Sequence, residues 1–101
     1  MSNIDEPQSS PLVRKIARIT AKPNRGQALS EALRDLEFAT RREVGCREFA
    51  FFRALSDPDS FVLVETFENE MALELHLALP HTRRFCAVKL VENVTVAAIS
   101  E

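Results

Sequence analysis

The residues best suited to acid–base chemistry gather in one stretch of the sequence, from Phe61 to His81. This stretch holds both histidines of the chain, His76 and His81, and a carboxylate, Glu65, at the end of an apolar run. An imidazole exchanges protons near neutral pH, and a carboxyl group enclosed by apolar residues has a raised proton affinity. We therefore take His76 as a candidate proton acceptor and Glu65 as the group that orients or tunes it.

Each of these side chains also has a purely structural interpretation. Glu65 would then pair with an arginine or cap a backbone group, and His76 would be a core histidine bonded to a backbone carbonyl or to Glu65. His81, which follows Pro80, is a candidate substrate-binding residue or a surface residue. A metal site made of the two histidines and Glu65 is disfavoured, because the histidines are separated by a proline and do not share one helical face.

Phenylalanine supplies all of the aromatic character, because the sequence has neither Trp nor Tyr. We expect most of these rings in the core and some of them around an aromatic-binding pocket. The candidates for substrate contact, besides His81, are Phe49, Phe51, Phe67 and Phe85.

Composition excludes several classes of protein. With 101 residues, 28% of them charged and 46% hydrophobic, the chain is expected to form one globular domain. A net charge of -2 leaves no broad basic surface for nucleic acid. No apolar run approaches the ~20 residues of a membrane span. The sequence also lacks a secretory pattern at its start and metal-type cysteine spacing, so we expect a cytoplasmic protein.

Periodicity divides the chain into a tail and one domain. Residues 1 to 11 are polar and rich in serine and proline, which predicts a flexible tail before a domain over residues 12 to 101. Alternation predicts strands at 12–21, 46–55, 61–67 and 91–99. Helical spacing predicts helices at 27–43 and 70–79 and a shorter helical turn at 81–88.

Two finer predictions concern the helices. Gly45 is expected to end the first helix in the left-handed conformation that glycine adopts without strain. Met71, Leu75 and Ala78 or Leu79 are expected to form the buried stripe of the second helix.

The order strand, helix, strand, strand, helix, strand is that of the ferredoxin-like split βαβ arrangement, an α+β fold. The helices would cover one face of a four-stranded antiparallel sheet and leave the other face bare. An apolar sheet face usually finds a partner, so we expect a symmetric homodimer.

Three motifs carry a resemblance to a known family. They are Glu43-Val44-Gly45-Cys46, then Asp57-Pro58 with the strand Phe61–Glu65, and finally Ala72, His76 and Pro80-His81. With these motifs the sequence resembles the antibiotic biosynthesis monooxygenase (ABM) domain family over about residues 12 to 99. Members include cofactor-independent monooxygenases of polycyclic aromatic quinols, heme-degrading enzymes and proteins of no known activity. The resemblance implies a dimeric α+β barrel with a pocket between sheet and helices.

The sequence departs from the family pattern at three aromatic or rigid positions. Phe67 stands where the family has tryptophan, Phe49 where it often has tyrosine, and Val44 where it has proline. The pocket therefore has no phenol or indole group to offer. The Asn, Trp and His trio of heme-degrading members has no match here.

The resemblance implies a monooxygenase that oxidises a small aromatic or quinol-type substrate with O2, without metal, flavin or other cofactor. Such an enzyme supplies a base, a dry pocket and orientation. The alternative is a non-catalytic small-molecule-binding or structural dimeric module of the same fold. The lack of Trp and Tyr weighs toward this alternative.

Overall fold

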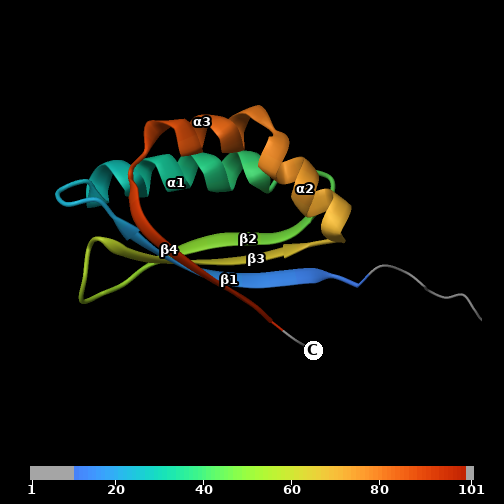
Figure 1. Cartoon of the computed structure of the whole chain (residues 1–101), viewed down its shortest axis with the longest axis horizontal. Coiled ribbons are helices and arrows are strands. Elements are labelled where there is room, and N and C mark those ends of the chain that lie inside the picture. Colours follow the sequence, from blue (N-terminus) through green and yellow to red (C-terminus); the bar gives the residue numbers. More distant parts are fainter. Residues whose placement is uncertain (1–10, 100–101) are drawn as a thin grey trace, which may run out of the picture.

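A computed structural model describes residues 11–99, in which three helices cover one face of a four-stranded antiparallel sheet (Figure 1). The elements are β1 (Val13–Ala21), α1 (Gly26–Thr40), β2 (Cys46–Arg53), β3 (Ser60–Phe67), α2 (Glu70–Ala78), α3 (Pro80–Val88) and β4 (Val91–Ala98). The strand order β2-β3-β1-β4 confirms the predicted ferredoxin-like α+β fold. Of the predicted tail, all but Pro11 lies outside the described residues.

The core lies between α1 and the centre of the sheet. Leu29, Leu33 and Leu36 follow helical spacing along α1 and are buried there. Ala17 and Ile19 alternate with exposed residues on β1 and present the other side of this core. Burying a leucine fully contributes ~1.5–3 kcal/mol, so this stripe fixes α1 on the sheet. No helix within residues 11–99 is long and apolar enough to cross a bilayer.

Gly45 has a different role from the predicted one. The helix α1 ends at Thr40, its cap residue Arg41 is right-handed, and neither glycine has a positive φ. A Cβ at position 45 would instead overlap the side chain of Ala72 on α2. Glycine is needed here because the α1–β2 connection and α2 touch at this point. The left-handed helix end belongs to Lys89, the cap of α3, with φ 57°.

The predicted stripe of α2 is also wrong. Met71 and Leu75 are 77% and 60% exposed, whereas Leu73 and His76 are the buried residues of this helix. The Asn69 side chain caps the helix by accepting a hydrogen bond from the Ala72 backbone N–H at 2.9 Å. The helix therefore turns a mixed polar and apolar face inward, which hydrophobic spacing alone does not reveal.

The second face of the sheet carries apolar side chains without a helix above them. Ile16 on β1 and Phe52 on β2 are 38% and 57% exposed, and Val62 and Val64 on β3 are partly buried. All three helices lie on the opposite side of the sheet (Figure 1). This arrangement agrees with the predicted bare face.

Candidate functional site

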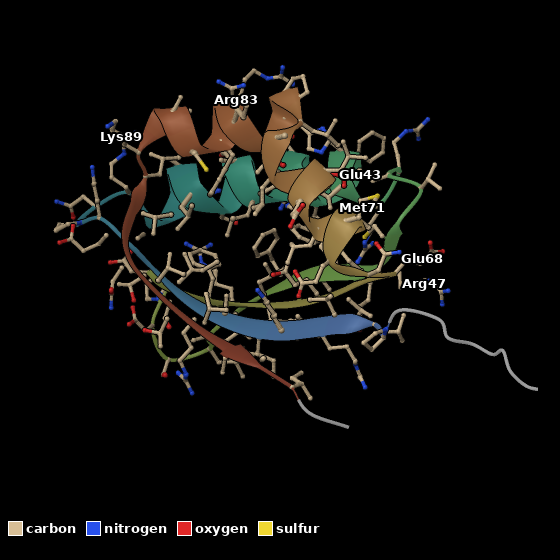
Figure 2. The ribbon with its side chains drawn as sticks, turned by 45° about the vertical axis from the view of Figure 1, so that its right-hand side comes forward. Glu43, Arg47, Glu68, Met71, Arg83 and Lys89 are labelled. Carbon is tan, nitrogen blue, oxygen red and sulfur yellow. The ribbon has the colours of Figure 1, made fainter. Side chains whose placement is uncertain are left out.

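The structure brings three titratable side chains together at one end of the helix layer. They are Glu43 from the α1–β2 connection, His76 from α2 and His81 from α3. Figure 2 shows Glu43 beside the helix α2. Glu43 Oε2 lies 2.9 Å from His76 Nδ1 and 2.5 Å from His81 Nε2. The three side chains are 9%, 5% and 21% exposed, so one enclosed carboxylate oxygen serves two imidazoles.

A break between two short helices positions the histidines. Leu79 is extended, with φ -72° and ψ 151°, and it both ends α2 and precedes α3. Pro80 opens α3, where its fixed φ suits the first helical turn and its missing N–H costs nothing. The chain direction changes at this break, so His76 from the last turn of α2 and His81 from the first turn of α3 reach the same oxygen.

The backbone around Glu43 is held by two hydrogen bonds. Its N–H donates to the Thr40 carbonyl at 2.9 Å, and its carbonyl accepts from the Cys46 N–H at 3.1 Å. Glu43 is thus fixed between the end of α1 and the start of β2. In the sequence, Glu43 stands out only as part of the Glu43-Val44-Gly45-Cys46 motif, and it is not among the predicted site residues.

His76 is enclosed by aromatic rings. Its ring centroid lies 5.3 Å from that of Phe49 and 5.0 Å from that of Phe67. Thr82 Oγ1 lies 3.4 Å from Nδ1, the same nitrogen that faces Glu43. An ionised carboxylate only accepts hydrogen bonds, so pairing with ionised Glu43 places the proton on Nδ1. Nε2 then carries the lone pair, and no side chain among residues 11–99 bonds to it.

Glu65 lies on the helix-facing side of β3, opposite Lys15 in the β1–β3 register. Burial raises the pKa of the Glu65 carboxyl above its ordinary value, and the positive charges of His76 and Lys15 oppose that rise. Glu65 is therefore an electrostatic neighbour of His76. The hydrogen-bonded carboxylate of His76 is Glu43.

The predicted substrate-binding residues are divided among three places. Phe49 and Phe67 pack on His76, and Phe51 lines a cavity between α1 and β2. His81 and Phe85 line a smaller cavity of about 280 Å³ between α1 and α3. The cavity that contains Phe51 is larger, about 590 Å³, but it includes neither His76 nor Glu43. Proximity of titratable groups, rather than cavity size, therefore defines this candidate site.

The same cluster has the ligand types of a divalent-cation site. Glu43, His76 and His81 each offer one ligand atom, and these atoms lie within 4.8 Å of one another. The metal site considered from the sequence combined the two histidines with Glu65, whereas the structure combines them with Glu43. In the structure described here the three groups satisfy one another by hydrogen bonds.

This chain is similar to known proteins over most of its length. Residues 12–88 match the profile of the family described as "Antibiotic biosynthesis monooxygenase". A Mycobacterium tuberculosis protein named "Putative monooxygenase Rv0793" is 33% identical over 66 residues, which is 65% of this chain and 64% of that protein. This chain thus matches somewhat less than two thirds of that relative's length.

Solved structures agree with this assignment. PA3566 from Pseudomonas aeruginosa is 30% identical, with a TM-score of 0.86 over 94% of this chain and 98% of that one. Rv0793 from Mycobacterium tuberculosis is 28% identical in its structure, with a TM-score of 0.79 over 90% and 95% of the two chains. The chain belongs to the antibiotic biosynthesis monooxygenase family.

Proposed function

We propose that this protein is a cofactor-independent monooxygenase that oxidises a small aromatic, quinol-type substrate with O2. One observation carries the proposal: Glu43 holds His76 through Nδ1 and leaves Nε2 without a bond to a side chain among the described residues. A carboxylate that fixes the tautomer and orientation of an imidazole is a recurring arrangement for a general base.

The reaction begins when His76 Nε2 takes a proton from the activated substrate. The resulting carbanion gives an electron to O2, and recombination forms a carbon–oxygen bond. The peroxide, protonated by the imidazolium, then loses water as the carbon–hydrogen bond breaks, which leaves a carbonyl group. A CH2 group and O2 thus yield C=O and H2O, with one oxygen atom in each product.

The surroundings of the base support a small apolar substrate. Phe49 and Phe67 shield the imidazole from water, which strengthens electrostatic interactions there. Glu65, Lys15 and Ala98 lie in register across β3, β1 and β4 on the helix-facing side of the sheet. A cavity of about 330 Å³ touches Lys15 and Ala98, which makes this row a candidate place for substrate entry.

Oxygen uptake with a panel of quinols and anthrones tests the proposal. A general base contributes about 100- to 10,000-fold, so His76→Gln should lower kcat by that factor while the amide keeps a hydrogen bond to Glu43. His81→Asn is the matched control and should act mainly on KM. Wild-type activity in His76→Gln would refute the base. Loss of wild-type turnover in EDTA would refute cofactor independence and assign Glu43, His76 and His81 to a metal.

We also propose a homodimer formed through the bare face of the sheet. Sedimentation velocity at micromolar concentration should give twice the monomer mass, and Ile16→Glu should shift the chain to monomer because it places a charge in that face. Met71→Glu, at an exposed position of α2, is the control and should leave the mass unchanged. A wild-type monomer would refute the dimer.

A second candidate function is a non-catalytic module that binds a small aromatic molecule. The absence of Trp and Tyr from the sequence favours it, since no phenol or indole is available to the substrate. A quinone that raises the melting temperature of the protein, with no oxygen consumed from any quinol, would select this candidate.

A further inference from the structure

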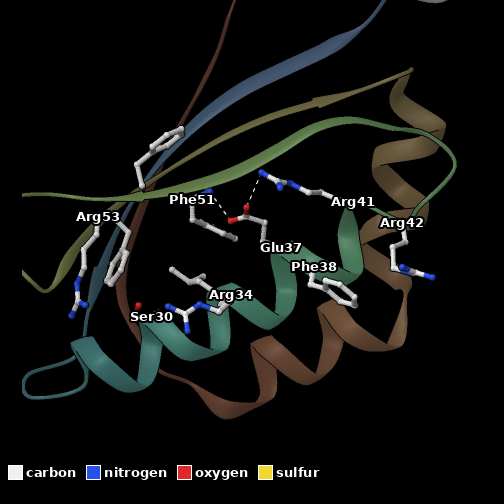
Figure 3. A pocket seen from close by; sticks show the side chains of 11 residues that line it. Ser30, Arg34, Glu37, Phe38, Arg41, Arg42, Phe51 and Arg53 are labelled. Carbon is white, nitrogen blue, oxygen red and sulfur yellow. Dashed lines mark hydrogen bonds and ion pairs between the residues drawn. The ribbon is translucent and has the colours of Figure 1, made fainter.

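A second cavity lies away from the histidines, between α1 and the edge strand β2 (Figure 3). Its volume is about 590 Å³, within the ~300–1,000 Å³ typical of small-molecule sites. None of Glu43, His76 and His81 lines it. It is therefore a separate place where a ligand of moderate size fits.

The floor of this cavity is an ion pair that is hydrogen-bonded to the backbone of β2. Glu37 Oε2 pairs with Arg41 at 2.7 Å, and Glu37 Oε1 accepts a hydrogen bond from the Phe51 N–H at 3.2 Å. Arg41 Nε donates to the Phe49 carbonyl at 2.9 Å. Figure 3 shows these side chains reaching from α1 to β2. The Glu37–Arg41 pair thus satisfies two backbone groups at the free edge of β2. The charges of the two side chains cancel each other.

Three further arginines, Arg34, Arg42 and Arg53, surround this floor without a carboxylate partner among the described residues. Arg53 donates to the Pro58 carbonyl at 2.8 Å, a neutral acceptor. The guanidinium of Arg42 lies over the Phe38 ring, 5.5 Å from its centroid. The cavity is therefore positively charged, although the whole chain carries -2.

The remaining wall is apolar and aromatic. Leu33 and Phe61 are buried beneath it, and Phe51 is partly buried. Guanidinium groups bind carboxylates through paired N–H donors, and phenylalanine walls bind flat rings. The cavity thus offers neighbouring contacts for an anionic group and for the flat apolar ring of one ligand.

We propose that this cavity binds a small aromatic carboxylate, with Arg34 holding the anionic group, Arg42 adding to the positive field and Phe51 contacting the ring. The site is independent of the proposed oxygenase chemistry, since it shares no residue with the cluster of Glu43, His76 and His81, which we call the Glu43 cluster. Its ligand is a charged molecule, whereas the acid–base site takes a substrate that still carries its proton.

Titration calorimetry with 2-naphthoate tests the proposal, and 2-naphthol serves as the ligand of similar ring and no carboxylate. The wild type should bind naphthoate at least about 10-fold more tightly than naphthol at low salt, and the difference should shrink at high salt. The double variant Arg34→Gln/Arg42→Gln should weaken naphthoate binding about 10-fold and leave naphthol binding unchanged. Arg83→Gln, an exposed arginine of α3 outside the cavity, is the matched control and should bind like the wild type.

Amide chemical shifts locate the bound molecule. Naphthoate should shift the signals of Arg34, Phe38 and Phe51, with smaller changes at His76. Three outcomes would overturn the proposal: no naphthoate binding at millimolar concentration, equal affinity for naphthol, or equal weakening by Arg83→Gln and by the double variant. Unchanged oxygen uptake in the double variant would show that the two sites are separate.

Discussion

The Glu43 cluster and the arginine-lined cavity use the same kind of charged group in opposite ways. Glu37 and Glu43 lie six residues apart near the end of α1. Glu43 is 9% exposed and is shared by two imidazoles, whereas Glu37 is 24% exposed and is paired with an arginine that is itself 56% exposed. Glu43 is enclosed between two imidazoles, whereas Glu37 is about a quarter exposed and lies beside a guanidinium group.

This difference separates a chemical site from a binding site. Imidazoles change charge near neutral pH, so the Glu43 cluster can move a proton. Guanidinium groups stay charged at all ordinary pH values, so the cavity offers a constant positive field. Enclosure suits the first task because it excludes water, and an open rim suits the second because the ligand must enter with its charge.

The largest expected effect on stability comes from removing each carboxylate in turn. Removing the enclosed carboxylate leaves two imidazole N–H donors without their acceptor at ~1–3 kcal/mol each, so Glu43→Ala should lower the free energy of unfolding by ~2–6 kcal/mol. Glu37→Ala should cost only ~1 kcal/mol, because it removes one partly exposed pair and one backbone hydrogen bond. Urea denaturation of both variants measures the difference.

Glu43→Gln is the control for this comparison, since the amide keeps an acceptor for one imidazole and should recover part of the loss. Equal losses in Glu43→Ala and Glu37→Ala would remove the distinction between an enclosed and an open carboxylate.

A smaller effect is expected where the α1–β2 connection touches α2. A methyl group at position 45 would overlap Ala72, and overpacking of this kind costs ~1–3 kcal/mol, so Gly45→Ala should destabilise the fold by that amount. Ala72→Gly should restore part of it in the double variant, although glycine in a helix itself costs about 1 kcal/mol. Additive losses in the double variant would show that the two residues do not compete for space.

The fold was predictable from sequence because its signals are local. Ala17 and Ile19 alternate along β1, and Leu29, Leu33 and Leu36 repeat along α1, so burial and periodicity agree. The errors arose where tertiary contact overrides local pattern. Glycine is required at position 45 because Ala72, a residue far along the chain, leaves no space for a Cβ. The inward face of α2 is determined by His76 and its hydrogen bond to Glu43.

The site was predictable only in part. His76 and His81 stand out as titratable groups in one stretch, and the structure does place them together. Their shared carboxylate is more than thirty residues earlier in the chain, where no local pattern links it to the histidines. Glu65 was found by its apolar surroundings, and those same surroundings raise its pKa without giving it a hydrogen bond to His76.

The smallest expected effect sharpens the contrast between Glu65 and Glu43. Burial raises the pKa of Glu65 above its ordinary value of 4.5, so the folded protein binds this proton more tightly than the unfolded chain does. The wild type should therefore lose stability as pH rises from about 4.5 through the raised pKa. Glu65→Gln cannot ionise and escapes that loss. Its melting temperature relative to the wild type should thus increase across this window and stay constant above it. Glu74→Gln, at an exposed position of α2, controls for removal of a surface carboxylate. A relative melting temperature of Glu65→Gln that falls with rising pH would show that His76 and Lys15 outweigh the burial of Glu65 and that its charged form is the one the fold favours.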